Sequence, residues 1–164
     1  MRGTLLFILS ILTIAPIASS ATAPAANTAA KVRADVQTFV KAYIESANKA
    51  DITALMEMFS RESGVTSIDD GEISRGWDAI RAENDQAVGK EGSYKISVGA
   101  IDVMPLGAGY ALAIAPYTLT VATAQGEVQL PSAMTMVLEK SGSKWVIVHE
   151  HMSTKAAPET DQQQ

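Results

Sequence analysis

The chain contains no cysteine among its 164 residues. This absence excludes disulfide bonds, thiolate metal sites, cysteine nucleophiles and a lipid anchor on an N-terminal cysteine. Histidine is scarce as well, with two residues, and no HExxH motif or carboxylate cluster accompanies them. A lone pair of histidines is a weak metal signal. We therefore expect neither a metal site nor a cofactor.

Basic residues are few and scattered. The chain has 13 Lys and Arg against 18 Asp and Glu, for a net charge of −5, and no Lys/Arg cluster. Nucleic acids and anionic membranes attract proteins through basic patches, so neither is an expected partner. No internal repeat is visible. A hydrophobic fraction of 47% in a chain of this length predicts one domain with a core of its own.

No apolar run reaches the about 20 residues that a membrane span needs. Residues 5–17 are the apolar stretch at the N-terminus; Arg2 precedes them and small residues follow at 18–21. This order is typical of a secretory signal peptide. We expect residues 1–21 to be removed after Ala21, with a periplasmic or secreted product that is not bound to a membrane. The alternative is a buried N-terminal helix.

The first half of the remaining chain has helical spacing. Apolar residues recur every three or four positions over residues 32–47, which predicts a long amphipathic helix. Asp51 is a candidate N-cap for a second helix over 52–59. A third helix is expected from Trp77 to Ala87. Between these two helices, residues 65–68 predict a short strand, and Asp70-Gly71 a turn.

The second half has strand patterning. Four extended segments, 94–104, 110–123, 127–139 and 144–152, are separated by glycine-containing turns. Such short connections favour an antiparallel sheet. Residues 110–121 are apolar at both parities, which predicts a central strand buried on both faces. Helices followed by strands indicate an α+β domain over residues 31–155. Residues 22–30 are expected to be a linker, and 156–164 a disordered tail.

Several short sequences resemble one superfamily. Phe39-Val40-Lys41-Ala42-Tyr43-Ile44, Asn48-Lys49-Ala50-Asp51 and Met58-Phe59 resemble the opening of ketosteroid isomerases and SnoaL-like cyclases. Residues 75–80 resemble the start of their third helix. Residues 142–153 resemble their last strand, and that of the calcium/calmodulin-dependent kinase association domain. The resemblance spans residues 32–153. It implies the cone-shaped nuclear transport factor 2-like fold, with three N-terminal helices packed on a curved antiparallel sheet.

The resemblance also implies which strand faces look into the cone. Side chains alternate along a strand, and the inward parity is that of Val146, Val148, Glu150 and Met152, together with Ser132, Met134, Met136 and Leu138. We expect a small, largely apolar ligand to contact Met134, Met136, Val148 and Met152, with Trp77 at the mouth. Methionine-rich walls adapt to varied apolar ligands. The alternative is that these side chains fill a solid core.

Glu150 is the candidate acid or base. A carboxyl group that faces an apolar pocket has its pKa raised by desolvation, which suits acid–base chemistry near neutral pH. The alternative is a rim position, in water or paired with Arg75, Arg81 or Lys155. A kinase-type site for small acids is doubtful, because Met136 and Met152 match that family's pocket arginines.

Tyr43 matches, by resemblance, the tyrosine that stabilises the oxyanion in ketosteroid isomerases. Ser67 occupies the position of the isomerase base, Asp69 follows at the same parity, and Met134 replaces the protonated aspartate. Classical 3-ketosteroid isomerisation is therefore not expected. If the protein is an enzyme, the resemblance implies isomerisation, cyclisation or hydration with Glu150, Tyr43 and Asp69. The other open possibility is a non-catalytic binding or dimerisation module.

The opposite parity of the last strand carries Trp145, Ile147, His149 and His151. This parity faces the convex side of the sheet in the resembling families. Large apolar patches left in water usually mark interfaces. The row therefore predicts a homodimer through the convex face.

Overall fold

The computed structural model describes residues 26–90 and 94–155. Its helices are α1 (Ala26–Asn48), α2 (Ile52–Met56) and α3 (Trp77–Lys90). Asp51 caps α2 as predicted, because its carboxylate accepts a 3.0 Å hydrogen bond from the Ala54 amide. Since α1 begins at Ala26, the predicted linker is already helical from that residue onward. The predicted signal peptide and C-terminal tail lie outside the described residues. None of the described helices is long and apolar enough to cross a membrane.

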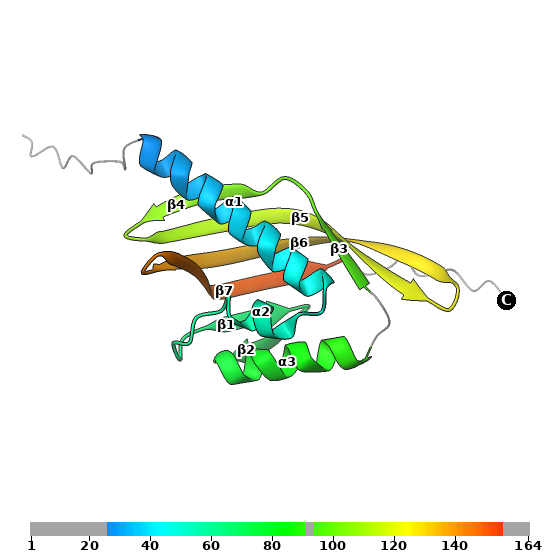
Figure 1. Ribbon diagram of the computed structural model, residues 1–164. Coiled ribbons are helices and arrows are strands. Elements are labelled where there is room, and N and C mark those ends of the chain that lie inside the picture. Colours follow the sequence, from blue (N-terminus) through cyan, green and yellow to red (C-terminus); the bar gives the residue numbers. More distant parts are fainter. Residues whose placement is uncertain (1–25, 91–93, 156–164) are drawn as a thin grey trace, which may run out of the picture.

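The strands form one curved sheet (Figure 1). They are β1 (Thr66–Asp69), β2 (Glu72–Arg75), β3 (Tyr94–Val98), β4 (Asp102–Gly107), β5 (Tyr110–Thr123), β6 (Gly126–Ser141) and β7 (Lys144–Thr154). Their order is β2-β1-β7-β6-β5-β3, and β4 also pairs with β5. The β1–β7 pair is parallel, so the sheet is mixed and the antiparallel prediction was wrong there. Short connections fix the direction of consecutive strands only, and β1 and β7 are far apart in the chain.

Two turns shape the ends of this sheet. Asp70 and Gly71 have φ angles of 46° and 95°, which is the two-residue turn that suits a β-hairpin. The predicted turn therefore joins β1 to a second strand, β2, which the sequence pattern did not indicate. The expected strand over 94–104 divides into β3 and β4 around Gly99. A Cβ at Gly99 would lie 3.1 Å from the Pro116 ring, so this close approach favours glycine.

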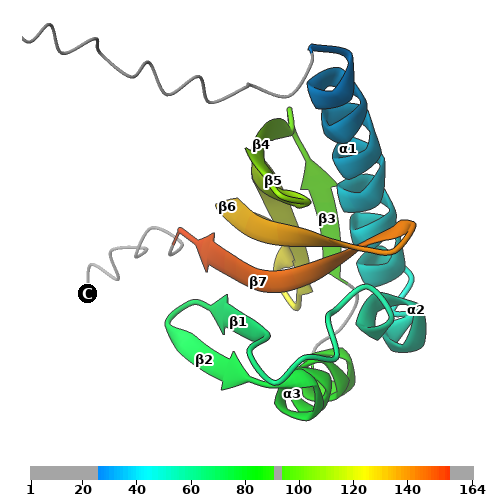
Figure 2. The ribbon, with the colours of Figure 1, turned by 90° about the vertical axis from the view of Figure 1, so that its left-hand side faces the viewer.

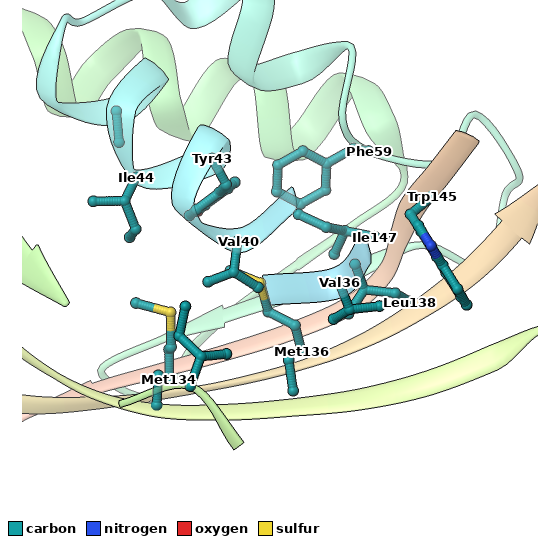
Figure 3. Packing of buried hydrophobic residues seen from close by; sticks show 14 of the residues in the cluster. Val36, Val40, Tyr43, Ile44, Phe59, Met134, Met136, Leu138, Trp145 and Ile147 are labelled. Atoms are coloured by element: carbon teal, nitrogen blue, oxygen red, sulfur yellow. The ribbon is translucent and has the colours of Figure 1, made fainter. Parts of the chain in front are cut away.

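The core lies between α1 and the concave face of the sheet. Helix α1 crosses this face, and α3 lies beside the β1–β2 hairpin (Figure 2). Val36 and Val40 of α1 meet Met134, Met136 and Leu138 of β6, all buried (Figure 3). Burying each such side chain contributes about 1.5–3 kcal/mol. This packing fixes α1, and with it Tyr43, over the middle of the sheet.

A β-bulge in β7 changes which of its residues face the core. Met136 pairs with Glu150 and Val137 with His149, but Leu138 then pairs with Ile147, so Val148 is an extra residue. An extra residue reverses the side-chain alternation beyond it. Ile147 and Trp145 are consequently 0% and 8% exposed in the core. The predicted convex row was wrong for these two residues, and Val148 is not a regular inward-facing position.

Strand β5 is buried on one face only. Ala111, Ala113, Ala115 and Tyr117 alternate toward the core, whereas Ile114 on the other face is 46% exposed. The prediction that both faces are buried within the chain was wrong, because the helices cover only the concave side. The convex side keeps an apolar surface, which includes Met104 at 59% exposure.

Candidate functional site

Three buried polar side chains meet at the centre of the concave face. Glu150 of β7 is 4% exposed. The Tyr43 hydroxyl, from α1, donates a 3.0 Å hydrogen bond to its Oε2. The Ser67 hydroxyl, from β1, donates a 2.9 Å hydrogen bond to its Oε1. Each carboxylate oxygen thus has one hydroxyl donor, and neither donor is charged.

The backbone explains how these three residues come together. The parallel β1–β7 register sets Ser67 directly beside Glu150. Tyr43 lies on the buried stripe of α1, and its ring meets Phe59 edge-on at 6.3 Å between centroids. Phe59 is itself fixed by a bridge to Ile147. The contact of the Tyr43 ring with Phe59 therefore helps to direct its hydroxyl at Glu150.

Burial dominates the electrostatics of Glu150. Desolvation raises the pKa of Glu150 to about 7, although the hydrogen bonds from Ser67 and Tyr43 lower it in part. The charges of Asp69 and Glu83 raise it further. Burial, and next the Glu150 charge, raises the pKa of Tyr43 well above its usual value. Glu150 can therefore exchange a proton near neutral pH while Tyr43 stays a neutral donor.

The rim alternative does not describe Glu150. Its carboxylate is buried and bonded to hydroxyl groups. Arg81 instead pairs with Asp85 at 3.0 Å, and Arg75 and Lys155 are exposed.

Asp69 is near this group but is not bonded into it. It lies two residues beyond Ser67 on β1, opposite Met152, and is exposed. Desolvation of its carboxyl group and the neighbouring charges of Asp70, Glu83 and Glu72 raise the pKa of Asp69. The hydroxyl hydrogens of Tyr43 and Ser67 are already given to Glu150. Asp69 therefore acts on Glu150 through its charge, from the edge of the concave face.

Two further residues of this region were not predicted as functional. Ser67 was noted only as the position of a missing base, because its contact with Glu150 depends on the parallel pairing. Glu83 of α3 has a buried Oε2 without a hydrogen-bond partner among the described residues. Its helical position carries no motif that could have indicated this. Both residues change the proton affinity of Glu150.

The predicted ligand-binding residues differ in how deeply they are buried and in what they contact. Met134 and Met136 are fully buried beneath α1, and Met152 is partly buried on the same face. Trp77 is partly buried, donates a 2.9 Å hydrogen bond to the Met56 carbonyl and has the Arg61 guanidinium 3.5 Å from its ring centroid. Val148 is the bulge residue. Met134 and Met136 thus pack as core side chains in this conformation.

Two surface hollows among the described residues are not lined by Glu150, Tyr43 or Met136. One, of about 730 Å³, lies between the β1–β2 turn, the far end of the β5–β6 hairpin and the end of β7. The other, of about 660 Å³, lies near the β6–β7 turn and includes Phe59 and Lys140. Neither hollow therefore gives a molecule direct access to Glu150, which is 4% exposed.

The histidines lie on the other side of β7. His149 Nδ1 and Thr66 Oγ1 share a 2.7 Å hydrogen bond, and His151 is exposed. Within residues 26–90 and 94–155, no group of three or more His, Asp or Glu side chains could hold a metal ion.

Solved structures share this architecture at low sequence identity. A nuclear transport factor 2-like superfamily protein from Salmonella enterica serovar Typhimurium has a TM-score of 0.69 at 21% identity, covering 81% of this chain and 97% of that one. A candidate dehydratase of the nuclear transport factor 2-like family from Streptomyces avermitilis has a TM-score of 0.70 at 13% identity, covering 78% of this chain and 99% of that one. A candidate calcium/calmodulin-dependent protein kinase II association domain from Xanthomonas campestris has a TM-score of 0.62 at 19% identity, covering 76% of this chain and 87% of that one.

These similarities show the class of fold, which is the α+β nuclear transport factor 2-like fold that the sequence resemblance predicted. Within this class the chain belongs to the SnoaL-like domain family, which matches residues 36–157. No functionally curated protein matches the chain.

Proposed function

We propose that this SnoaL-like protein is exported, binds a small, largely apolar molecule beneath α1, and performs acid–base chemistry on it through Glu150. One observation carries the proposal. Glu150 is buried, is held by two neutral hydroxyl donors, and has a pKa of about 7. A group that titrates near the working pH is an efficient general acid or base. Perturbed carboxyl groups of this kind gather at functional sites.

The chemistry follows from the two oxygens of Glu150. As a carboxylate it can take a proton from an activated C–H or O–H group, and as an acid it can return the proton elsewhere on the same molecule. Tyr43 donates to Oε2 in the resting state, and a substrate oxygen that becomes negative beside Oε2 can share this hydrogen bond. The charge of Asp69, at the edge of the concave face, raises the proton affinity of Glu150. Isomerisation, cyclisation and dehydration all use such steps, and one structural neighbour is a candidate dehydratase.

Methionine and apolar side chains supply the binding surface. Met136 pairs directly with Glu150, and Met134 with Met152. Methionine has an unbranched, flexible side chain that repacks readily, so a ligand can open space between α1 and β6. The apolar surroundings that raise the pKa of Glu150 also select an apolar ligand.

The first test uses a simple carbon acid as a probe. We expect the protein to accelerate exchange of the α-protons of 1-indanone in D2O, followed by NMR. Glu150→Gln keeps the shape of the side chain and should reduce the acceleration by about 100-fold or more, which is typical of losing a general base. Glu127→Gln is the matched control, because Glu127 is exposed on the β5–β6 hairpin. Equal rates for both variants, or no acceleration by the parent protein for indanone and related small ketones, would count against the enzymatic proposal.

Export is tested separately. The order of residues 1–21 motivates cleavage after Ala21. Intact-mass analysis of protein from the envelope of its host should give a chain that begins at Thr22. Protein that still carries Met1 and is confined to the cytoplasm would contradict export. The same sample, sprayed under native conditions, should carry extra mass if a ligand is retained.

The second candidate function is a dimerisation module, and the exposed convex face favours it. Met104 and Ile114 are 59% and 46% exposed there. We expect light scattering to give a homodimer and Ile114→Glu to convert it to a monomer, because an unpaired charge in an apolar interface is costly. Ala42→Glu is the control, because Ala42 is exposed on α1, which covers the opposite, concave face of the sheet. A monomeric parent protein at all concentrations would exclude this interface.

A further inference from the structure

A row of three polar residues crosses one edge of the sheet. Ser67 of β1 pairs in register with Glu150 of β7 on one side and with Ser74 of β2 on the other. Residues directly opposite one another project from the same face of a sheet. Ser67 is buried and Ser74 is partly buried. The row ends there, because β2 is the outermost strand on this side of the described sheet.

The two hydrogen bonds at Glu150 are compatible only with its ionised carboxylate. With Tyr43 and Ser67 both donating, the carboxyl group must be ionised. When Glu150 takes a proton it becomes a donor itself, so one of the two hydroxyls must turn and accept. A phenol hydrogen prefers the plane of its ring, and the Tyr43 ring is held against Phe59. A serine hydroxyl rotates freely about its Cβ–Oγ bond, so Ser67 is the group that turns.

Once Ser67 has turned, its own hydrogen needs an acceptor. The cross-strand neighbour on the same face is Ser74, and directly opposed residues have Cβ atoms about 4.5–5.5 Å apart. Two hydroxyl groups can bond across this separation. Ser74, being partly exposed at the edge strand, can in turn meet water.

We propose that Ser67 and Ser74 form a hydroxyl route through which Glu150 exchanges its proton with solvent at the β2 edge. Glu150 gives its proton to Ser67 Oγ while the Ser67 proton passes to Ser74 Oγ and the Ser74 proton passes to water. One proton leaves Glu150, one reaches solvent, and both hydroxyls end neutral. The reverse movement returns a proton from water to the Glu150 carboxylate. The inference rests on the proposed function, in which Glu150 changes protonation state at each turnover.

The other groups around Glu150 do not supply this path. Tyr43 from α1 is a neutral donor, and the hydroxyl of Thr66 is bonded to His149 on the opposite face. Glu83 from α3 and Asp69 from β1 raise the proton affinity of Glu150. Asp69 is a competitor, because it is exposed at the edge of the same concave face. A route through β1 and β2 leads toward the β2 edge and leaves the part of the concave face over β6 free for the ligand.

The test measures proton exchange at the Glu150 carboxyl carbon in the full chain. Carbon-13 relaxation dispersion near the midpoint of titration gives the exchange rate, and the titration itself gives the midpoint. Ser74→Ala should slow exchange about tenfold, the equivalent of one hydrogen bond lost from the path, with the midpoint unchanged. Ser74→Thr should restore the rate. Ser67→Ala should slow exchange and also raise the midpoint, since it removes a donor to the carboxylate.

Thr66→Val is the matched control, because it removes a hydroxyl from the same strand on the opposite face. It should leave rate and midpoint unaltered. If Ser74→Ala leaves the rate of proton exchange at Glu150 unchanged, the route is overturned. If Asp69→Asn slows this exchange instead, the proton leaves through Asp69. If Ser67→Ala does not fold, the comparison of Ser74→Ala with Ser74→Thr is sufficient to test the route. A Glu150 midpoint at or below 4.5 in the parent protein contradicts the proposed function itself, whatever the exchange rates.

Discussion

Glu150→Gln is expected to stabilise the protein at pH 8 by up to about 3 kcal/mol, which is the free energy that corresponds to raising a carboxyl pKa from 4.5 to about 7. The parent protein must bury a charge at this pH, and the variant does not. The amide preserves the local bonding, because its oxygen can accept from one hydroxyl and its nitrogen can donate to the other. Ser67, which can turn, is the natural acceptor.

The pH dependence fixes the sign of this effect. Since the folded-state pKa of Glu150 is raised, folding favours the protonated group. That contribution is fully present below about pH 4.5 and is lost as pH rises to about 7. Urea unfolding across pH 4–8 should show the parent losing stability over this window relative to Glu150→Gln, with the two equal at pH 4. Glu127→Gln, at an exposed position, should follow the parent. A Glu150→Gln protein that unfolds more easily at neutral pH would mean that the carboxylate is a structural acceptor.

The second large effect concerns charge placed in the core. Met136→Arg and Leu138→Arg each put a guanidinium at a position with 0% exposure on the same face of β6. A buried, unpaired charge destabilises a protein by roughly 3–5 kcal/mol. Leu138 pairs with Ile147, so the charge there has no partner, but Met136 pairs with Glu150. The register therefore gives a charge at position 136 a partner that a charge at position 138 lacks.

The two arginine variants should therefore differ with pH. The guanidinium at position 136 favours the Glu150 carboxylate and lowers its pKa. Met136→Arg should thus recover part of its stability as pH rises from 4 to 8, opposite in direction to the parent, whereas Leu138→Arg should not recover. Thermal unfolding at both pH values measures this difference. Identical pH dependence in the two variants would show that Glu150 is not within reach of position 136.

The sequence predicted the features that depend on neighbouring residues. The amphipathic stripe of α1, the Asp51 cap and the Asp70-Gly71 turn are local patterns, and the structure contains each of them. The fold followed from the order of these elements and from resemblance. Placing Glu150 and Tyr43 in one interior also succeeded, because both lie on regular, inward-facing positions.

Several of the missed features depend on long-range pairing, whereas strand β2 was missed although it pairs locally with β1. The bulge at Val148 reversed the facing of Trp145 and Ile147, and nothing in the local alternation indicates an extra residue. The parallel β1–β7 register, which brings Ser67 to Glu150, joins segments 83 residues apart. The buried oxygen of Glu83 arises from the docking of α3. Roles for Asp69 and for the ligand-binding methionines stay predictions.

The most direct test of the account is the pKa of Glu150, measured in the full chain by the carbon-13 chemical shift of its carboxyl carbon between pH 3 and 9. Tyr43→Phe supplies an internal check, since loss of that donor should raise the value further. The account predicts a midpoint of about 7. A midpoint at or below the usual 4.5 would contradict it, because Glu150 would then be a solvated or ion-paired carboxylate with no proton to exchange near neutral pH.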